Sequence, residues 1–178
     1  PSIRRATDER GATLVEMAIV MPVLLMILIG IMELGIAFRD VMGASQAVRE
    51  GVRLASFAGD SIDADCTIIE GVAPFLATFM DNLDRVEIYQ ANAAGNQIPG
   101  KTNIYTFTTG DPGECDDWIA TVQWNSTSRQ TRLGTSPLDI IGVRVVMDHT
   151  WITQFPPFSG EFTIDETAIG RLEPESFE

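Results

Sequence analysis

Residues 12–38 read ATLVEMAIVMPVLLMILIGIMELGIAF, and no charged side chain lies between Glu16 and Glu33. A helix needs about 20 mostly apolar residues to cross a bilayer core of ~30 Å, so this stretch is long enough to span a membrane. Its apolar residues occupy every face of a helix and leave no polar stripe, which disfavours the alternative of a buried core helix. The stretch therefore predicts a transmembrane helix at 12–38.

A cleavable secretory signal is the second alternative, and it has an apolar core of about 7–15 residues followed by small residues. This run is longer and ends at Phe38 and Arg39, so we interpret it as a retained anchor. Arg4, Arg5 and Arg10 precede it, which places the N-terminus in the cytoplasm by the positive-inside rule. The chain after Arg39 holds 21 of the 25 carboxylates and is expected outside the cytoplasm.

Composition bounds the rest of the chain. Its 178 residues favour one domain plus an appendage. A hydrophobic content of 45% supplies enough apolar residues for a folded core, so an intrinsically disordered chain is not expected. A net charge of -13 excludes nucleic acid as a partner, since phosphate binding requires basic residues.

The two cysteines, Cys66 and Cys115, lie far apart and fit neither a CxxC redox motif nor a zinc pattern. Two reduced, buried thiols are one interpretation. In a domain outside the cytoplasm a disulfide is favoured instead, and it would close a long loop.

The apolar helix is expected to continue beyond the membrane. From Arg39 onward the pattern becomes amphipathic, and Gly59 is a suitable stop, so we predict one helix from about 13 to about 58, roughly 70 Å long. Residues 62–83 have helical spacing interrupted by Pro74 and predict a broken or kinked second helix.

Beyond residue 84 the apolar period changes to two. Alternating segments bounded by Gly, Pro and Asn predict four or five antiparallel strands packed on the outer half of the long helix. The segments are 85–90, 103–108, 118–124, 141–147 and, more weakly, 162–168.

The N-terminal segment resembles a known family. Gly11-Ala-Thr-Leu-Val-Glu16 before an apolar helix resembles the prepilin signature, and the segment with Pro22, Glu33 and AVREGVRLA at 47–55 is similar to the TadE-like family of the tight-adherence pilus machinery. The resemblance is strong over 11–58 and weaker over 140–174.

The resemblance implies a pilin-like subunit that assembles with copies of itself or related pilins, with a prepilin peptidase and a pilus assembly platform as partners. It implies cleavage between Gly11 and Ala12, the alternative being a chain that works uncut, and assembly roles for Glu16, Pro22 and Glu33. A carboxylate at the edge of hydrocarbon is costly, so Glu16 is expected to pair with the new α-ammonium of Ala12. Snorkelling to the headgroups is the alternative.

Other motifs indicate little chemistry. His149 is the only histidine, and its neighbour Asp148 would point to the opposite face of a strand, so no triad and no enzyme is predicted. No cofactor is expected, except that a disulfide would bring two acidic loops together and leave open a calcium site. Its candidate ligands are Asp63, Asp65, Asp111 and Asp116. A solvated acidic rim is the alternative.

Together these patterns predict an α+β chain: a leader or cytoplasmic tail at 1–11, the membrane or filament-core helix at 12–38, its amphipathic continuation at 39–59, and an extracytoplasmic head at 60–178 with a second helix and an antiparallel sheet. The leading interpretation is a pilus subunit in the cytoplasmic membrane with its head outside, later part of a surface filament. The alternative is a single-pass anchored binding protein that does not polymerise.

Overall fold

The computed structural model describes residues 3–132, 137–154 and 156–174, with side chains from residue 11 onward. The chain divides into two compact units. The first, the helix unit, is Pro1–Phe38 together with Trp151–Gly160. The second, the head unit, is Arg39–Thr150 together with Glu161–Glu178. Each unit is described by itself below.

Helix α1 runs from Ile3 to Ala58 and contains Pro22 without interruption. It starts earlier than the sequence pattern predicts and ends where the pattern changes before Gly59. Among the described residues, α1 is the one helix long and apolar enough to cross a membrane, and its most apolar window has a mean hydropathy of 2.7 with none of that window buried. Length and composition thus agree with the anchor predicted from the sequence.

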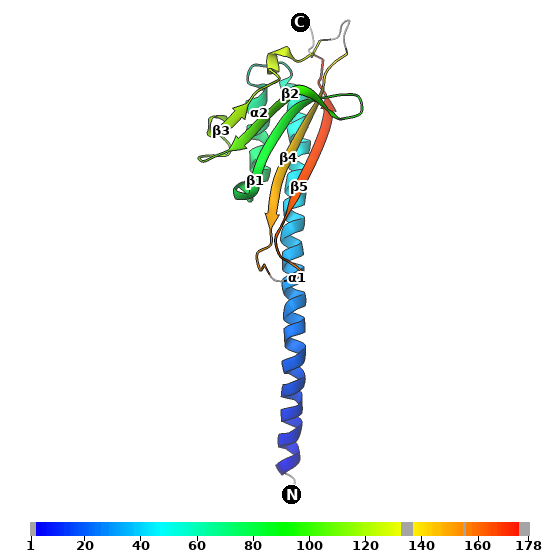
Figure 1. Ribbon diagram of the computed structural model, residues 1–178, viewed down its shortest axis with the longest axis vertical. Helices are drawn as coiled ribbons and strands as arrows, with labels where there is room; N and C mark the ends of the chain where they lie inside the picture. Colours follow the sequence, from blue (N-terminus) through cyan, green and yellow to red (C-terminus); the bar gives the residue numbers. More distant parts are fainter. Residues whose placement is uncertain (1–2, 133–136, 155, 175–178) are drawn as a thin grey trace. The chain divides into compact units, whose positions relative to one another are not determined.

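The head unit contains a five-stranded antiparallel sheet in the order β3-β2-β1-β4-β5 (Figure 1). Helix α2, Ala64–Leu76, precedes it in the chain. The strands are β1 Leu83–Ala91, β2 Gln97–Phe107, β3 Trp118–Thr121, β4 Ile140–Thr150 and β5 Glu161–Arg171. The predicted α+β class, with a long first helix, a second helix and an antiparallel sheet, is confirmed.

The head core forms where residues 39–58 of α1, helix α2 and one face of the sheet meet. Ala47, Gly51 and Ala55 recur every four residues and therefore share one face of α1. A Cβ on Gly51 would lie 3.0 Å from side-chain atoms of both Val143 and Val72, so a larger residue would require these valines to shift away from the helix. The small residues in the AVREGVRLA segment thus set the packing distance of the head.

The other face of the sheet carries ion pairs. Glu87 accepts hydrogen bonds from Arg85 Nε and Gln97 Nε2, both at 2.6 Å, and lies 3.3 Å from Arg144 Nη1. Burial alone would raise the pKa of Glu87, but these hydrogen bonds and the two positive charges outweigh burial and hold its pKa below the usual range. Arg144 also binds Asp165 through Nε at 2.7 Å, which joins β1, β4 and β5 across this face.

Three sequence predictions differ most in extent from the structure, and the first is strand β2, which begins at Gln97 rather than 103. The second helix ends at Leu76, two residues after Pro74, rather than continuing to 83, and Met80–Asn82 forms a 3-10 turn. Strand β3 ends at Thr121 instead of 124, because the side-chain oxygen of Asn103 accepts the backbone N–H groups of Gln123 and Trp124 at 2.9 and 2.7 Å.

Candidate functional site

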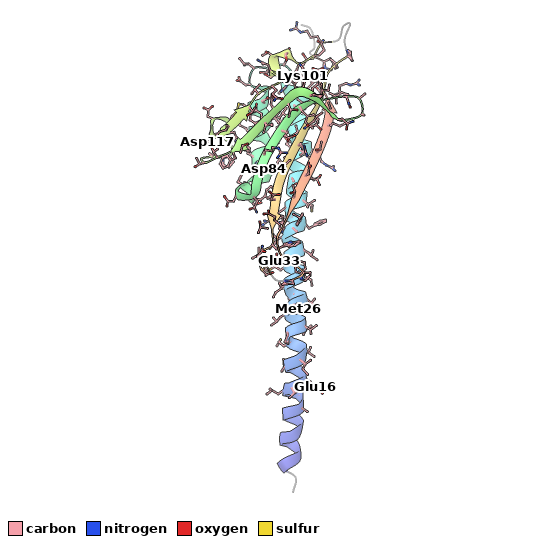
Figure 2. The ribbon with its side chains drawn as sticks, in the orientation of Figure 1. Glu16, Met26, Glu33, Asp84, Lys101 and Asp117 are labelled. Carbon is pink, nitrogen blue, oxygen red and sulfur yellow. A yellow bond between two sulfur atoms is a disulfide. The ribbon has the colours of Figure 1, made fainter. Side chains whose placement is uncertain are left out.

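The apolar part of α1 presents its side chains outward on all sides between Glu16 and Glu33 (Figure 2). Nearly all its large hydrophobic residues are exposed in the single chain, from 38% for Ile29 to 71% for Leu14. Exposing an apolar helix surface of this length to water is unfavourable, so lipid or other apolar helices must cover it. The helix surface itself is therefore the first candidate site.

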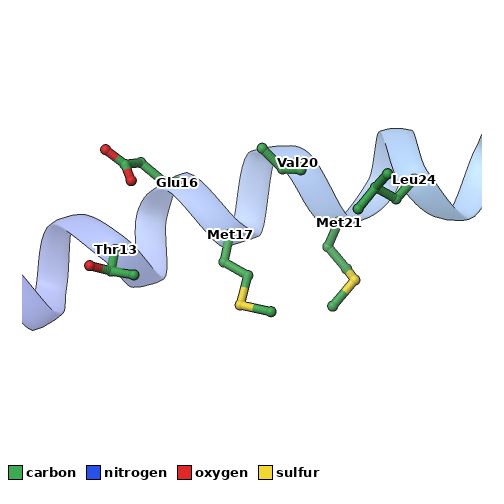
Figure 3. Close-up of a pocket in the computed structure, with 6 residues that line it drawn as sticks. All are labelled: Thr13, Glu16, Met17, Val20, Met21 and Leu24. Atoms are coloured by element: carbon green, nitrogen blue, oxygen red, sulfur yellow. The ribbon is translucent and has the colours of Figure 1, made fainter.

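One face of this helix holds Glu16. A shallow groove of about 270 Å³ is lined by Thr13, Glu16, Met17, Val20, Met21 and Leu24. Figure 3 shows the Glu16 carboxylate pointing away from the helix axis and away from Met17 and Met21. Among the side chains that the structure describes, Glu16 has no hydrogen-bond or ion-pair partner. This face combines an apolar surface with one carboxylate, the composition that a partner helix with a positive group would match.

The residues named for processing lie one turn before Glu16. Gly11 and Ala12 are exposed and lie within α1, and a Cβ on Gly11 would meet nothing within 4 Å. Ala12 and Glu16 are four residues apart, so they share one side of the helix. A new α-ammonium at Ala12 would thus lie on the side of its own Glu16.

Pro22 and Glu33 lie on a different side of α1 from Glu16. At 3.6 residues per turn, the face formed by Pro22, Leu25, Met26 and Ile29 is centred roughly 160° away from the Glu16 face. These four residues line a second groove, and Pro156, Pro157 and Phe158 line its other wall. The two predicted assembly residues at 16 and 22 therefore do not belong to one contact surface.

Glu33 is fully buried, at 0% exposure. Its Oε2 accepts the backbone N–H of Ile152 at 3.1 Å, and its Oε1 accepts that of Thr153 at 2.6 Å. Two charge-assisted hydrogen bonds stabilise a buried carboxylate. Glu33 thus fastens residues 152–153 to α1 within one chain, a role that sequence reasoning missed because the two partners are about 120 positions away.

In the head unit, Cys66 and Cys115 form the predicted disulfide, with a Cα–Cα distance of 5.3 Å. It joins the start of α2 to the 3-10 turn Cys115–Asp117 and brings two acidic loops together. Asp63, Glu70, Glu114 and Asp116 line the shared surface.

Of the four carboxylates considered for calcium, two, Asp63 and Asp116, line this surface. Asp65 turns into the core, and Asp111 Oδ1 accepts the backbone N–H of Gly113 at 2.9 Å. Over the described residues, no three Asp, Glu, His or Cys side chains form a group that could hold a metal ion.

Asp65 is the centre of a buried polar network. Its Oδ2 accepts Asn103 Nδ2 at 2.6 Å and Tyr105 Oη at 2.8 Å, and its Oδ1 pairs with Arg129. Arg129 also lies over the Trp124 ring, with 4.6 Å from Cζ to the ring centroid. Burial raises the pKa of the Tyr105 phenol well above its ordinary value, and the Asp65 charge raises it further, so Tyr105 stays a donor.

His149 has a carboxylate partner, but it is not Asp148. His149 Nδ1 lies 2.8 Å from Asp40 Oδ2 on α1, while Asp148 accepts the Thr163 hydroxyl on the other face of the strand. Both members of the pair are buried, and Phe162 packs beside the imidazole with 5.0 Å between ring centroids. The pair fastens β4 to α1 in the head core.

We expect the disulfide to stabilise the head strongly. Replacing both cysteines by alanine should lower the free energy of unfolding by about 4 kcal/mol, because the bond closes a loop with a sequence separation of 49. Urea unfolding of the full chain in detergent micelles, followed by tryptophan fluorescence, measures this. The wild-type chain under reducing conditions is the control and should unfold like the double variant; an unchanged midpoint in both would contradict the expectation.

The comparisons agree with the sequence resemblance. Residues 11–53 match the family described as TadE-like protein. No curated protein and no solved structure matches the chain. The predicted resemblance is confirmed over these residues, which include the Glu16 face, Glu33 and most of the AVREGVRLA segment, whereas 140–174 lies outside the match. Over residues 11–53 the chain is thus similar to TadE-like proteins of the Tad pilus machinery, and its first helix is long and apolar enough to anchor it in a membrane.

Proposed function

We propose that this membrane-anchored, TadE-like chain is a pilin-like structural subunit, assembled through α1 into a pilus or a pilus-initiating complex with its head exposed for surface adhesion. The observation that carries the proposal is the exposed apolar surface of α1 with a single carboxylate, Glu16, on one face. Lipid covers this surface while the chain is in the membrane. When a subunit leaves lipid, only other helices can replace it.

Glu16 gives the assembly its register. A carboxylate without a partner is costly in hydrocarbon or in a packed helix bundle, so each subunit must meet a positive group at this depth. Cleavage between Gly11 and Ala12 creates such a group, the α-ammonium of Ala12, in the same chain or in a neighbour. A prepilin peptidase and an assembly platform are the partners that this sequence of events requires.

The same proposal assigns the parts of the chain. Residues 1–11 are the cytoplasmic leader or tail, 12–38 the membrane and later filament-core helix, 39–59 its continuation, and 60–178 the extracytoplasmic head. The three arginines before the span support this orientation. The disulfide supports it too, because such bonds persist in oxidising compartments.

The second candidate is an anchored binding protein that stays in the membrane. It is favoured by the acidic surface around Asp63, Glu70, Glu114 and Asp116, which could meet a basic partner. It makes no use of Glu16.

The location of the protein separates the two candidates. In cells that make the pilus apparatus, we expect the chain in material sheared from the cell surface, and we expect it to return to the membrane fraction when the assembly platform is deleted. Quantitative blotting of both fractions measures the ratio. A chain that remains in the membrane in both strains would support the anchored binding protein instead.

A further inference from the structure

The chain segment at residues 151–154 and 156–160, here called the return loop, packs against α1 inside the helix unit. Phe158 of this loop lies against Gly30, where an added Cβ would be 3.2 Å from the phenyl ring. Between them the loop and α1 form a groove of about 290 Å³. Its walls are Leu25, Met26 and Ile29 with Phe158, together with the prolines at 22, 156 and 157, so no polar side chain lines it.

The return loop satisfies much of its own backbone. Glu33 accepts the N–H groups of Ile152 and Thr153. Gln154 accepts the N–H of Gly160 at 3.0 Å and donates to the carbonyl oxygens of Trp151 and Gly160 at 2.7 and 3.4 Å. The two prolines carry no N–H at all. A loop that contacts lipid must form hydrogen bonds with its backbone groups inside the protein. In this loop, three backbone N–H groups and two carbonyl oxygens have such partners, and the prolines have no N–H that needs one.

The surface of the return loop is apolar and aromatic. Trp151 and Phe158 pack together with 5.2 Å between ring centroids, and Ile152 is 62% exposed. Gln154 holds a backbone φ of 49°, a left-handed conformation that its three side-chain hydrogen bonds stabilise. Tryptophan with neighbouring apolar side chains is typical of the membrane–water interface.

The length of the charge-free helix fixes the depth of the loop. Residues 17–32 span about 24 Å at 1.5 Å per residue, which is less than a hydrocarbon core of ~30 Å. One of the two flanking glutamates must therefore lie at or inside the hydrocarbon boundary. Glu33 is the one whose charge is satisfied within the chain, so the return loop that binds it lies at the outer boundary.

We propose that the return loop is a lipid-contacting element of the outer interface, and that the groove between the loop and α1 holds acyl chains of phospholipids while the chain is in the membrane. The groove opens on the same helix segment that crosses the bilayer, so it continues the surface already covered by lipid. It lies on the side of α1 away from Glu16, and the assignment does not depend on filament assembly. Glu33 acts here as a positioning residue, because it holds the loop at this depth.

Depth-dependent fluorescence quenching tests the lipid contact. The full chain is reconstituted in phosphatidylcholine vesicles with acyl chains brominated near the headgroup or near the bilayer centre. We expect loss of the Trp151 emission, stronger with shallow bromines, and no such loss in Trp151→Phe, because Trp118 and Trp124 are buried in the head core. Equal emission with and without bromines, or the same loss in Trp151→Phe, would overturn the proposal.

Photo-crosslinking identifies what occupies the groove. A photoreactive phenylalanine analogue replaces Phe158 in the same vesicles, with Ile119, a 62% exposed residue of β3, as the matched control position. We expect phospholipid adducts at position 158 at least several-fold above those at 119. Adducts to a second copy of the chain in place of lipid, or equal lipid labelling at both positions, would contradict acyl-chain binding.

Discussion

Asp65→Asn is expected to destabilise the head unit by about 3–5 kcal/mol, because it leaves the Arg129 guanidinium buried without a counter-charge. The Arg129 side chain is 0% exposed, and that of Asp65 is 12% exposed. The asparagine side chain can still accept from Asn103 and Tyr105, so the expected loss comes from the charge rather than from the hydrogen bonds. An effect of this size is a large fraction of the stability of a small domain.

Urea unfolding of the full chain in micelles, followed by tryptophan fluorescence, measures the change, since Trp124 packs against Arg129 and Trp118 also lies in the head core. Asp63→Asn is the matched control: Asp63 is exposed two residues earlier and makes no side-chain cap hydrogen bond to α2, so its replacement should shift stability by less than about 0.5 kcal/mol. Equal midpoints for the two variants would contradict a buried ion pair at Asp65.

The double variant Asp65→Asn/Arg129→Met separates charge from packing. Removing both charges relieves the uncompensated guanidinium, so the double variant should be more stable than Asp65→Asn alone. If it is less stable than the single variant, the packing of Arg129 on Trp124 rather than its charge would explain the effect.

Hydrophobic periodicity predicted the helices and strands whose residues follow a regular local spacing. The change from all-apolar to amphipathic spacing near Arg39 predicted the course of α1. Period-two alternation located four of the strands, although β2 begins six residues earlier and β3 ends three residues earlier than predicted. The weakly patterned segment 162–168 is nevertheless an eleven-residue strand, β5, because it pairs with β4 along its whole length. Pairing with a neighbouring strand outweighed its weak intrinsic preference.

The sequence pattern did not predict side-chain contacts between residues that are far apart in the chain. Asp65 was interpreted as a candidate metal ligand because it stands in an acidic run, yet it turns inward to Arg129, 64 positions away. His149 finds Asp40 at a separation of 109 rather than its neighbour. Such pairs depend on which elements meet in the core, and a hydrophobic period does not encode that.

The return loop shows the same limit. Its Gly and Pro content identified it as a turn, but nothing local indicated that its backbone would bind Glu33. One signal was present: an acidic residue at the outer end of an uncharged span needs a partner, and no nearby basic side chain other than Arg39 could supply one. A search for donors elsewhere in the chain would have been justified on that ground.

Glu16→Gln is expected to abolish assembly while leaving the head folded. Under the proposed function, the variant lacks the charge that would pair with the Ala12 α-ammonium, so subunits would lose both the attraction and the register that bring them together. In the anchored state the same change removes a costly carboxylate from the edge of the hydrocarbon, so membrane insertion should be unimpaired or improved. A simple membrane anchor would therefore tolerate it.

Two controls keep this result specific to the carboxylate. Glu16→Asp retains the charge one methylene closer to the helix and should restore part of the assembly. The N-terminal residue of each variant should be Ala12, because a failure of cleavage after Gly11 would block assembly for a different reason. Disulfide formation between Cys66 and Cys115 reports that the head is folded in every variant.

The measurement that tests the central claim most directly is the ratio of sheared-surface to membrane-retained protein for wild type, Glu16→Gln and Glu16→Asp, in cells making the cognate apparatus. We predict that Glu16→Gln falls at least tenfold below wild type, the equivalent of about 1.4 kcal/mol or more in assembly, with cleavage and head disulfide intact and Glu16→Asp between the two. A Glu16→Gln protein that reaches the sheared fraction at the wild-type ratio would contradict assembly through a paired carboxylate.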